Sequence, residues 1–160
     1  MIFVTVGTQL SFDRMIQAVD EWAATSDEEV VAQIGPSGLK PLHLKYQQFL
    51  TPDEFTAYMD QARAIIAHAG MGSILTALQL QKPIVILPRQ AALNEHRNDH
   101  QLATAGRFRE TRGIHVAMDE TELLAVLQNL NTLSASDGVG PYASAALITT
   151  IRDFIEGRSV

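Results

Sequence analysis

A glycine-rich turn with a single histidine, HAGMGS at residues 68–73, has the residue types most suited to binding chemistry in this sequence. Gly70 and Gly72 allow unusual backbone torsions and a close approach to a ligand. Ser73 lies at the predicted start of a helix, where free amides and the positive end of the helix dipole favour an anion. The turn therefore predicts a phosphate cradle, although such turns also occur for purely geometric reasons.

The turn matches neither of two common phosphate-binding motifs. It lacks the GK[ST] ending of a P-loop, and its glycines do not have the GxGxxG spacing of dinucleotide-binding proteins. The sequence therefore supports neither an ATPase nor a dinucleotide-binding enzyme.

A second polar cluster, NEHRNDH at residues 94–100, places His96 and His100 four residues apart on a predicted helix. That spacing suits a metal, but no third ligand has matching spacing, so ligand-facing or solvated histidines are the better interpretation and no metal is expected. Arg89 and Arg97 are candidates to neutralise a diphosphate or bind a sugar carboxylate. Ordinary surface ion pairs explain the two arginines equally well.

The elements that must position these residues alternate between strands and helices. Apolar, β-branched runs predict strands at residues 2–6, 30–34, 64–68, 83–88 and 114–118, with a further short strand within 43–49. Helical spacing predicts helices at residues 11–23, 51–62, 73–80, 94–108, 119–130 and 142–158. Ser11, Thr51 and Asp119 are the expected N-caps, and Glu54 completes a capping box with Thr51.

This order predicts an α/β fold, a Rossmann-like doubly wound parallel sheet that binds ligands at the carboxyl ends of its strands. One domain is expected over residues 1–160, and the small-residue loop 131–141 is the only linker candidate. That loop would let the terminal helix 142–158 detach. The apolar stripe of Leu147, Ile151, Phe154 and Ile155 then docks either on its own sheet or on a partner.

Composition narrows the function classes. The 160 residues contain no cysteine, which excludes disulfides and thiolate metal sites. The net charge of −6 argues against a nucleic-acid partner. The first 15 residues do not form a signal peptide and no run of 18 apolar residues exists, so a cytoplasmic location is expected.

The segment HAGMGSILTALQLQKPIVILP, followed by NDHQLATA, resembles the donor-binding signature of GT-B glycosyltransferases and is similar to the C-terminal domain of glycosyltransferase family 28. The start, IFVTVGTQLSFDRMI, resembles the stand-alone members of that family. These are the soluble subunit of the two-piece dolichol-pathway N-acetylglucosaminyltransferase and the small subunit of two-piece bacterial exopolysaccharide glycosyltransferases. The resemblance covers roughly residues 1–130, and the bacterial branch is the closer match.

The resemblance implies roles for particular residues. Gly7 and Thr8 would face the nucleotide diphosphate, which the turn would contact, and His100 and Gln101 would contact the donor sugar. Thr76 stands where related enzymes often have a glutamate that binds the ribose, so ribose recognition would differ here. The implied donor-binding set is Gly7, Thr8, His68, Gly70, Met71, Gly72, Ser73, Thr76, Arg89, His100 and Gln101.

The function implied is that of a donor-binding subunit in a two-component inverting hexosyltransferase for exopolysaccharide biosynthesis. A UDP-sugar is the substrate and no cofactor is expected. A membrane-associated acceptor-domain subunit would supply the base and the lipid-linked acceptor, which would hold this chain at the inner face of the membrane. The alternatives are a non-catalytic nucleotide-sugar-binding or partner-stabilising module and a self-sufficient homodimeric transferase. The sugar, among glucose, glucuronic acid and N-acetylglucosamine, is left open.

Overall fold

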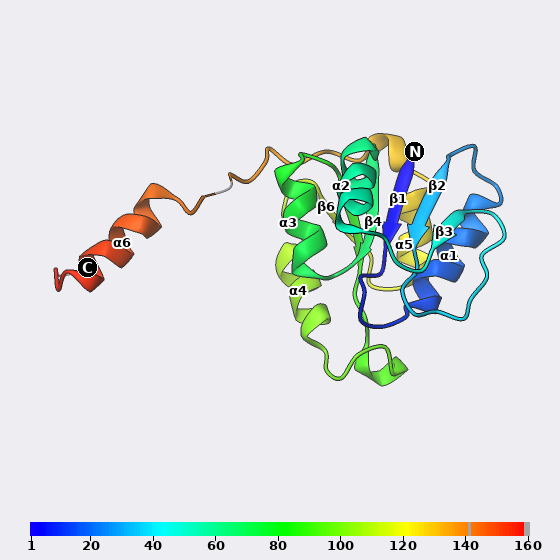
Figure 1. Cartoon of the computed structure of the whole chain (residues 1–160), viewed down its shortest axis with the longest axis horizontal. Coiled ribbons are helices and arrows are strands. Elements are labelled where there is room, and N and C mark those ends of the chain that lie inside the picture. Colours follow the sequence, from blue (N-terminus) through cyan, green and yellow to red (C-terminus); the bar gives the residue numbers. More distant parts are fainter. Residues whose placement is uncertain (141, 159–160) are drawn as a thin grey trace.

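A computed structural model describes residues 1–140 and 142–158, and within them a single parallel sheet organises the chain (Figure 1). Its six strands lie in the order β3-β2-β1-β4-β5-β6, and every neighbouring pair is parallel. The predicted fold class is therefore confirmed. The strands are β1 (Ile2–Thr5), β2 (Val30–Gln33), β3 (Lys45–Gln47), β4 (Ala64–His68), β5 (Ile84–Leu87) and β6 (Ile114–Val116).

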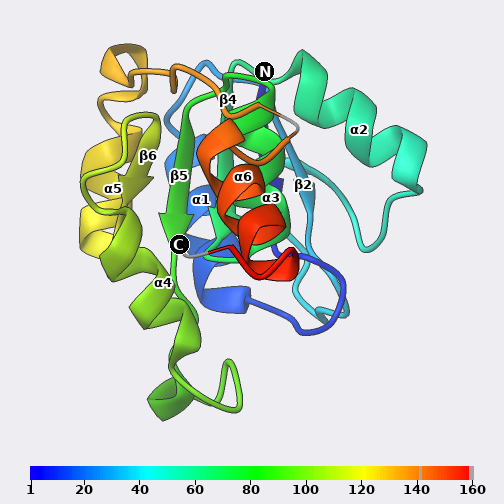
Figure 2. The same ribbon diagram turned by 90° about the vertical axis from the view of Figure 1, so that its left-hand side faces the viewer.

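Helices cover both faces of the sheet, which is why its central strands are apolar along their whole length. Helices α1 and α5 pack against one face, and α2, α3 and α4 pack against the other (Figure 1). In Figure 2, α3 lies in front of the sheet and α1 behind it. The helices are α1 (Asp13–Ala23), α2 (Pro52–Gln61), α3 (Met71–Gln79), α4 (His100–Phe108), α5 (Glu120–Leu127) and α6 (Ala145–Ile155).

Two of the three predicted helix caps are present. The Thr51 hydroxyl accepts a bond from the Glu54 amide, and the Glu54 carboxylate accepts one from the Thr51 amide, so the capping box is confirmed. Asp119 accepts from the Glu122 amide. The prediction for Ser11 is wrong, because α1 begins at Asp13 with Phe12 at the N-cap. Phe12 is buried in the core and Arg89 binds the Ser11 carbonyl, so tertiary contacts set this helix start.

Three other helix starts differ from the predictions, and one of them is that of α6, which begins at Ala145 and not at residue 142. Helix α3 begins at Met71, two residues early, with Gly70 at its N-cap. Helix α4 begins only at His100, because the chain after β5 forms a short 3-10 turn (Ala91–Leu93) that ends at the left-handed Asn94 (φ +57°). His96 therefore lies in a loop, and the prediction that it shares a helix with His100 is wrong.

The predicted linker is mostly fixed to the body. We call residues 133–138 the strap. The Ser136 hydroxyl donates to the Leu78 carbonyl at 3.3 Å, and Asp137 pairs with Arg112 at 2.7 Å. A side chain at Gly113 would come within 2.3 Å of the Ser136 nitrogen. Only residues 139–143 remain between the strap and the cap of α6, and Pro141 lies outside the described residues.

Helix α6 stands apart from the body (Figure 1). The Ser144 hydroxyl caps it by accepting from the Leu147 amide, but none of its residues is buried. Docking of this helix on its own sheet is therefore wrong, and docking on a partner stays a prediction.

Candidate ligand-binding site

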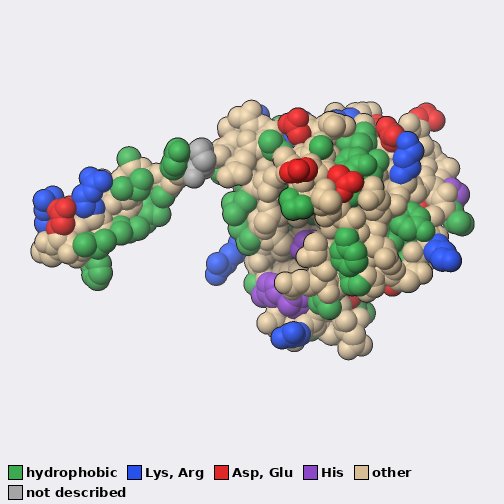
Figure 3. All heavy atoms as spheres, viewed as in Figure 1, with side chains coloured by type: hydrophobic (Ala, Val, Ile, Leu, Met, Phe, Trp, Pro, Cys, Tyr) green, Lys and Arg blue, Asp and Glu red, His purple; other side chains and the backbone are tan. Residues whose placement is uncertain are grey.

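A cavity of about 640 Å³ opens at the carboxyl ends of β1, β2, β4 and β5. Four segments surround it: the loop after β1, the end of the loop between β3 and α2 with the start of α2, the turn between β4 and α3, and the loop between β5 and α4. Figure 3 shows histidine side chains gathered on this part of the body. Ten of the eleven residues predicted for the site line the cavity: Gly7, Thr8, His68, Gly70, Gly72, Ser73, Thr76, Arg89, His100 and Gln101.

Met71 is the predicted site residue that does not line the cavity, and its side chain is 45% exposed. Reasoning from sequence also missed lining residues. One of them, Gln33, had a visible signal, because it is a polar residue ending a buried apolar strand. The residues missed are Thr5, Val6, Gln9, Leu10, Gln33, Leu50, Pro52, Phe55 and Thr56, while His96, expected as either a ligand-facing or a solvated histidine, lines the cavity.

The N-terminus of α3 opens into this cavity without a side-chain cap. In contrast, α2 and α5 are capped by their own threonine and aspartate side chains. The first amides of α3 therefore have no intrahelical carbonyl partner, and the positive end of the helix dipole faces the cavity. Ser73 is 8% exposed and lines the cavity. Such a helix start suits an anion.

The His68 ring is packed between two glycine backbones. A Cβ added at Gly7 would lie 3.0 Å from its Cε1 atom, and one at Gly70 would lie 2.2 Å from its Nε2 atom. Gly7 also has a left-handed backbone (φ +76°). Glycine is thus required at both positions so that the loops can close around the imidazole. A Cβ at Gly72, by contrast, meets nothing within 4 Å, so this residue borders open space in the cavity.

His68 is neutral at physiological pH. Burial of the ring, followed by the nearby charges of Arg89 and His96, lowers its pKa from 6.5 to about 4, against an opposing contribution from the Thr5 backbone. Its Nδ1 atom is buried with no hydrogen-bond partner in the described parts of the chain. The neutral imidazole therefore carries one N–H donor, one acceptor nitrogen and no charge.

A short hydrogen-bonded chain positions Gln33 on the wall of the cavity. The Gly7 amide donates to the Thr5 hydroxyl at 3.2 Å, and that hydroxyl donates to the Gln33 Oε1 atom at 3.0 Å. Gln33 is only 2% exposed. Because its carbonyl oxygen is engaged by Thr5, its amide nitrogen is the group left to donate to a ligand.

The hydroxyl proton of Thr76 is already donated in a hydrogen bond within α3. Its hydroxyl donates to the Gly72 carbonyl one helical turn earlier, at 2.9 Å. The side chain can therefore only accept a hydrogen bond from a ligand hydroxyl, whereas a carboxylate at this position would accept two.

His96 and His100 meet at the mouth of the cavity although they are not on one helix. Their rings contact edge to face, with centroids 4.4 Å apart. The His100 Nδ1 atom is bonded to the Asn98 side chain, and the pKa of His96 is lowered, first by desolvation and then by His100. Within residues 1–140 and 142–158, no group of three or more His, Asp or Glu side chains is arranged to hold a metal ion.

The charge distribution in the cavity favours an anion. Arg89 lies in its wall, and no Asp or Glu is among the described residues that line it, although the chain has a net charge of −6. Arg89 is 2% exposed, which is incompatible with the surface ion pair considered from sequence, whereas Arg97 is exposed. A charged arginine, an uncapped helix start and a neutral imidazole together can bind a phosphate-bearing ligand.

Comparison with known proteins agrees with this geometry. A family model described as glycosyltransferase family 28 C-terminal domain matches residues 1–137. The mouse (Mus musculus) protein named UDP-N-acetylglucosamine transferase subunit ALG13 is 30% identical over 105 residues. That stretch covers 59% of this chain but only 9% of the mouse protein.

Two solved structures share the fold. The solution structure of ALG13 has a TM-score of 0.61 at 18% identity and covers 94% of this chain and 93% of that chain. The crystal structure of the glycotransferase of kitacinnamycin has a TM-score of 0.60 at 22% identity and covers 82% of this chain and 34% of that chain. At such low identity these two likenesses show the fold alone.

Proposed function

The chain belongs to the family of glycosyltransferase family 28 C-terminal domains, and from that premise we propose that its cavity binds a UDP-sugar. The chain would be the donor-binding subunit of a two-component inverting hexosyltransferase. Its partner would hold a lipid-linked saccharide as the acceptor, in exopolysaccharide biosynthesis. The observation that carries the proposal is the anion-binding cavity at the carboxyl edge of the sheet, where α3 starts uncapped beside His68.

The lining residues suggest how the donor lies. The α3 amides, His68 and Ser73 would hold the diphosphate. The apolar and uncharged wall of Leu50, Pro52 and Phe55 would face the nucleoside. His100, at the other side of the cavity, would face the sugar.

The cavity supplies one half of the reaction. In an inverting transfer, the acceptor hydroxyl bonds to the anomeric carbon while the bond from that carbon to the diphosphate oxygen breaks. The electron pair of that bond leaves with the nucleotide diphosphate, so negative charge grows on the phosphate beside α3. Fixed amides aimed at that charge stabilise the transition state. The proton of the hydroxyl needs a base, and since no carboxylate lines the cavity in the described residues, we assign the base to the partner.

UDP-N-acetylglucosamine is the donor to test first, because the mouse relative is named a subunit of a UDP-N-acetylglucosamine transferase. Glucose and glucuronic acid remain the alternatives. An acidic sugar finds less support, because Arg89 is committed to the protein backbone.

Helix α6 is the segment we assign to partner docking. Its large apolar side chains are exposed along one side of the helix (Figure 3), from 42% at Ile148 to 77% at Phe154. Residues 139–143 extend by at most about 3.5 Å each, so the N-cap of α6 would lie within about 20 Å of the strap. No helix in the described ranges combines the length and hydropathy needed to cross a bilayer. Any membrane attachment would, on this proposal, come through the partner.

Calorimetric titration of the chain with UDP, ADP and the three UDP-sugars tests donor binding. We expect UDP to bind and ADP to bind weakly, with UDP affinity falling about tenfold in His68→Ala and in Ser73→Ala. His43→Ala is the matched control, because His43 is exposed and lies outside the cavity. Wild-type affinity in both site variants would remove the phosphate cradle from the proposal.

A non-catalytic nucleotide-sugar-binding or partner-stabilising module is the second candidate, and the lack of a carboxylate in the described cavity wall favours it. Activity assays with the co-expressed partner separate the two. Sugar transfer that requires both chains supports the two-component enzyme, and UDP-sugar binding without transfer supports the module. Turnover by this chain alone would instead support a homodimeric enzyme.

A further inference from the structure

Arg89 is held by the backbone of two separate loops. Its Nη2 atom donates to the Val6 carbonyl at 2.9 Å and to the Leu10 carbonyl at 2.8 Å, both in the loop after β1. Its Nη1 atom donates to the carbonyls of Ser11 and Glu95. Four of the five guanidinium N–H groups are thus engaged by main-chain oxygens. The side chain ties the loop after β1 to the loop after β5.

Other contacts fix the guanidinium further. It lies over the Phe12 ring, 4.7 Å from the centroid, and the Arg89 amide donates to the Gln101 Oε1 atom at 3.1 Å. Cation–π contact and backbone bonding restrict both ends of the residue. Gln101, predicted as a sugar contact, therefore also anchors the strand end that carries Arg89.

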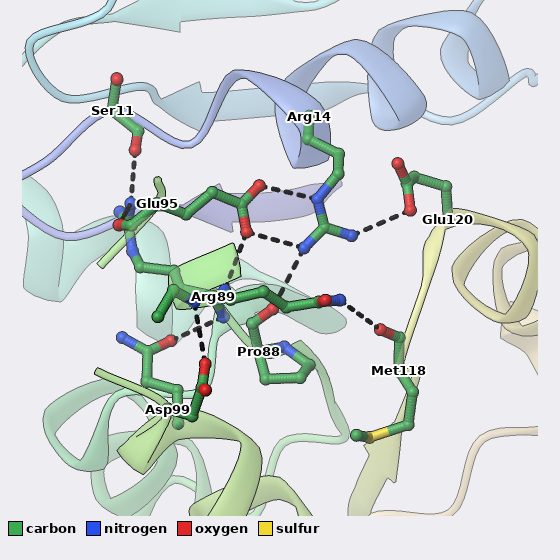
Figure 4. Close-up of polar contacts among 11 residues, drawn as sticks. Ser11, Arg14, Pro88, Arg89, Glu95, Asp99, Met118 and Glu120 are labelled. Atoms are coloured by element: carbon green, nitrogen blue, oxygen red, sulfur yellow. Dashed lines mark hydrogen bonds and ion pairs between the residues drawn. The ribbon is translucent and has the colours of Figure 1, made fainter. Parts of the chain in front are cut away.

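The carboxylate nearest to Arg89 is paired elsewhere (Figure 4). Glu95 accepts two hydrogen bonds from Arg14, at 2.7 and 2.9 Å, and one from the Gln90 amide at 3.0 Å. Arg14 also pairs with Glu120 at 2.9 Å. In the described residues, Arg89 forms no ion pair with any carboxylate.

Arg89 is thus a buried cation without a direct counter-charge. Burial lowers its pKa to about 10, with Glu95 and Asp13 opposing, so the guanidinium stays charged at neutral pH. A buried charge is unfavourable unless an opposite charge compensates it. The cavity that Arg89 lines is the place where a ligand anion can do so.

We propose that Arg89 is the positioning residue of the anion site: its guanidinium holds the loop of residues 6–11 against the cavity and places a positive charge beneath the bound diphosphate without donating to it. This inference rests on the proposed function. It replaces the direct contact with the diphosphate expected from sequence, because four of the five guanidinium N–H groups are already bonded to the backbone.

The test compares two variants. Arg89→Gln removes the positive charge and the guanidinium hydrogen bonds to the backbone, whereas Arg89→Lys keeps the charge but can donate to fewer carbonyls. Arg63→Gln is the matched control, because it removes the same charge from an ion pair with Glu28 outside the cavity. Titration with UDP and with uridine measures affinity. Hydrogen exchange of the unliganded chain measures protection of residues 7–12.

We expect UDP affinity to fall about thirtyfold in Arg89→Gln and about fivefold in Arg89→Lys, and uridine affinity to change less than about twofold. Exchange within residues 7–12 should be about tenfold faster in both variants, and Arg63→Gln should match the unmodified chain. A purely structural role for Arg89 would weaken UDP and uridine binding equally. Equal weakening therefore overturns the inference, as does UDP affinity within twofold of wild type in both variants.

Should Arg89→Gln fail to fold, Arg89→Lys decides by the same criteria. If the unmodified chain binds neither UDP nor any UDP-sugar, the proposed function fails for the isolated chain. The inference is then judged by hydrogen exchange alone, and unchanged protection of residues 7–12 in Arg89→Lys overturns it.

Discussion

The cavity and helix α6 differ in how their side chains are held. Around the cavity, His68 is enclosed by two glycine backbones and Arg89 is bonded to four carbonyls. In α6 no residue is buried, and Phe154 and Ile155 are 77% and 76% exposed. One region is fixed before any ligand arrives, and the other offers an apolar face that the described chain does not cover.

The difference matches the two roles proposed. Pre-positioned groups reduce the ordering that binding must otherwise impose, which suits a site that stabilises developing charge. An exposed apolar helix gains stability only when another surface covers it. The comparison therefore predicts that changes at the cavity alter both stability and binding, whereas changes on α6 alter association alone.

The largest expected effect is the response of His68 to acid. Above pH 6.5 the residue is neutral in the folded and the unfolded chain. Between pH 6.5 and 4 the unfolded chain takes up a proton that the folded chain, with its lowered pKa, does not, so the free energy of unfolding falls as the pH falls. The loss from this residue reaches about 3 kcal/mol below pH 4.

Urea unfolding of wild type and His68→Gln from pH 7.5 to 4 measures this loss. The variant should lose about 3 kcal/mol less than wild type over that range. His43→Gln, an exposed histidine outside the cavity, is the control and should follow wild type. Parallel curves for wild type and His68→Gln would contradict the depressed pKa.

Gly70→Ala is expected to cost about 2 kcal/mol of folding stability, because the new methyl group would meet the buried His68 ring at 2.2 Å. The backbone of Gly70 has φ −95°, so the cost arises from the close contact and not from torsional strain. Thermal unfolding measures it. Gly106→Ala within α4, where the added Cβ has open space, is the control and should not lose stability.

Gly72→Ala separates folding from binding. The residue lies in the first turn of α3 and its Cβ would meet nothing, so stability should rise by about 0.5 kcal/mol through helix propensity. The same methyl group would occupy space in the cavity and should weaken UDP binding about tenfold. A variant that is more stable and binds UDP normally would show that the ligand does not approach α3 here.

The smallest effect on stability is expected on α6. Ile151→Ser combined with Phe154→Ser should change the free energy of unfolding by less than about 0.5 kcal/mol and leave UDP affinity unchanged. The pair should, however, abolish co-purification with the acceptor-domain partner. Thr149→Ser with Thr150→Ser is the control. A marked loss of stability in the apolar pair would show that α6 packs on the body in solution.

Local sequence patterns predicted most of the fold. Continuous apolar runs placed five of the described strands, all except the polar β3, and the Thr51 and Asp119 caps placed the starts of α2 and α5. The patterns started α6 three residues early, and they also misplaced the starts of α1, α3 and α4, each of which follows a segment that lines the cavity. There the chain follows long-range contacts, such as the Arg89 bond to the Ser11 carbonyl, which no local spacing encodes.

The sequence identified which residues line the site better than it identified what each of them does there. Ten of eleven predicted residues line the cavity, because strand ends and following turns must meet at one edge of a parallel sheet. Roles depend on where each polar atom points. Arg89 donates to backbone carbonyls and Thr76 to its own helix, and Gln33 lines the site from a predicted strand whose end had not been assigned to it.

The sequence by itself determined the alternation of strands and helices, the glycine turn after β4, the family resemblance and the amphipathic last helix. Each of these depends on residue type and short-range spacing. Only the tertiary structure decided that Arg89 is buried without a carboxylate partner, that the strap is fixed and that α6 stands free. The first two of these properties depend on contacts between residues far apart in the sequence, such as Arg89 and Val6, which are 83 positions apart, and only the folded chain brings such residues together.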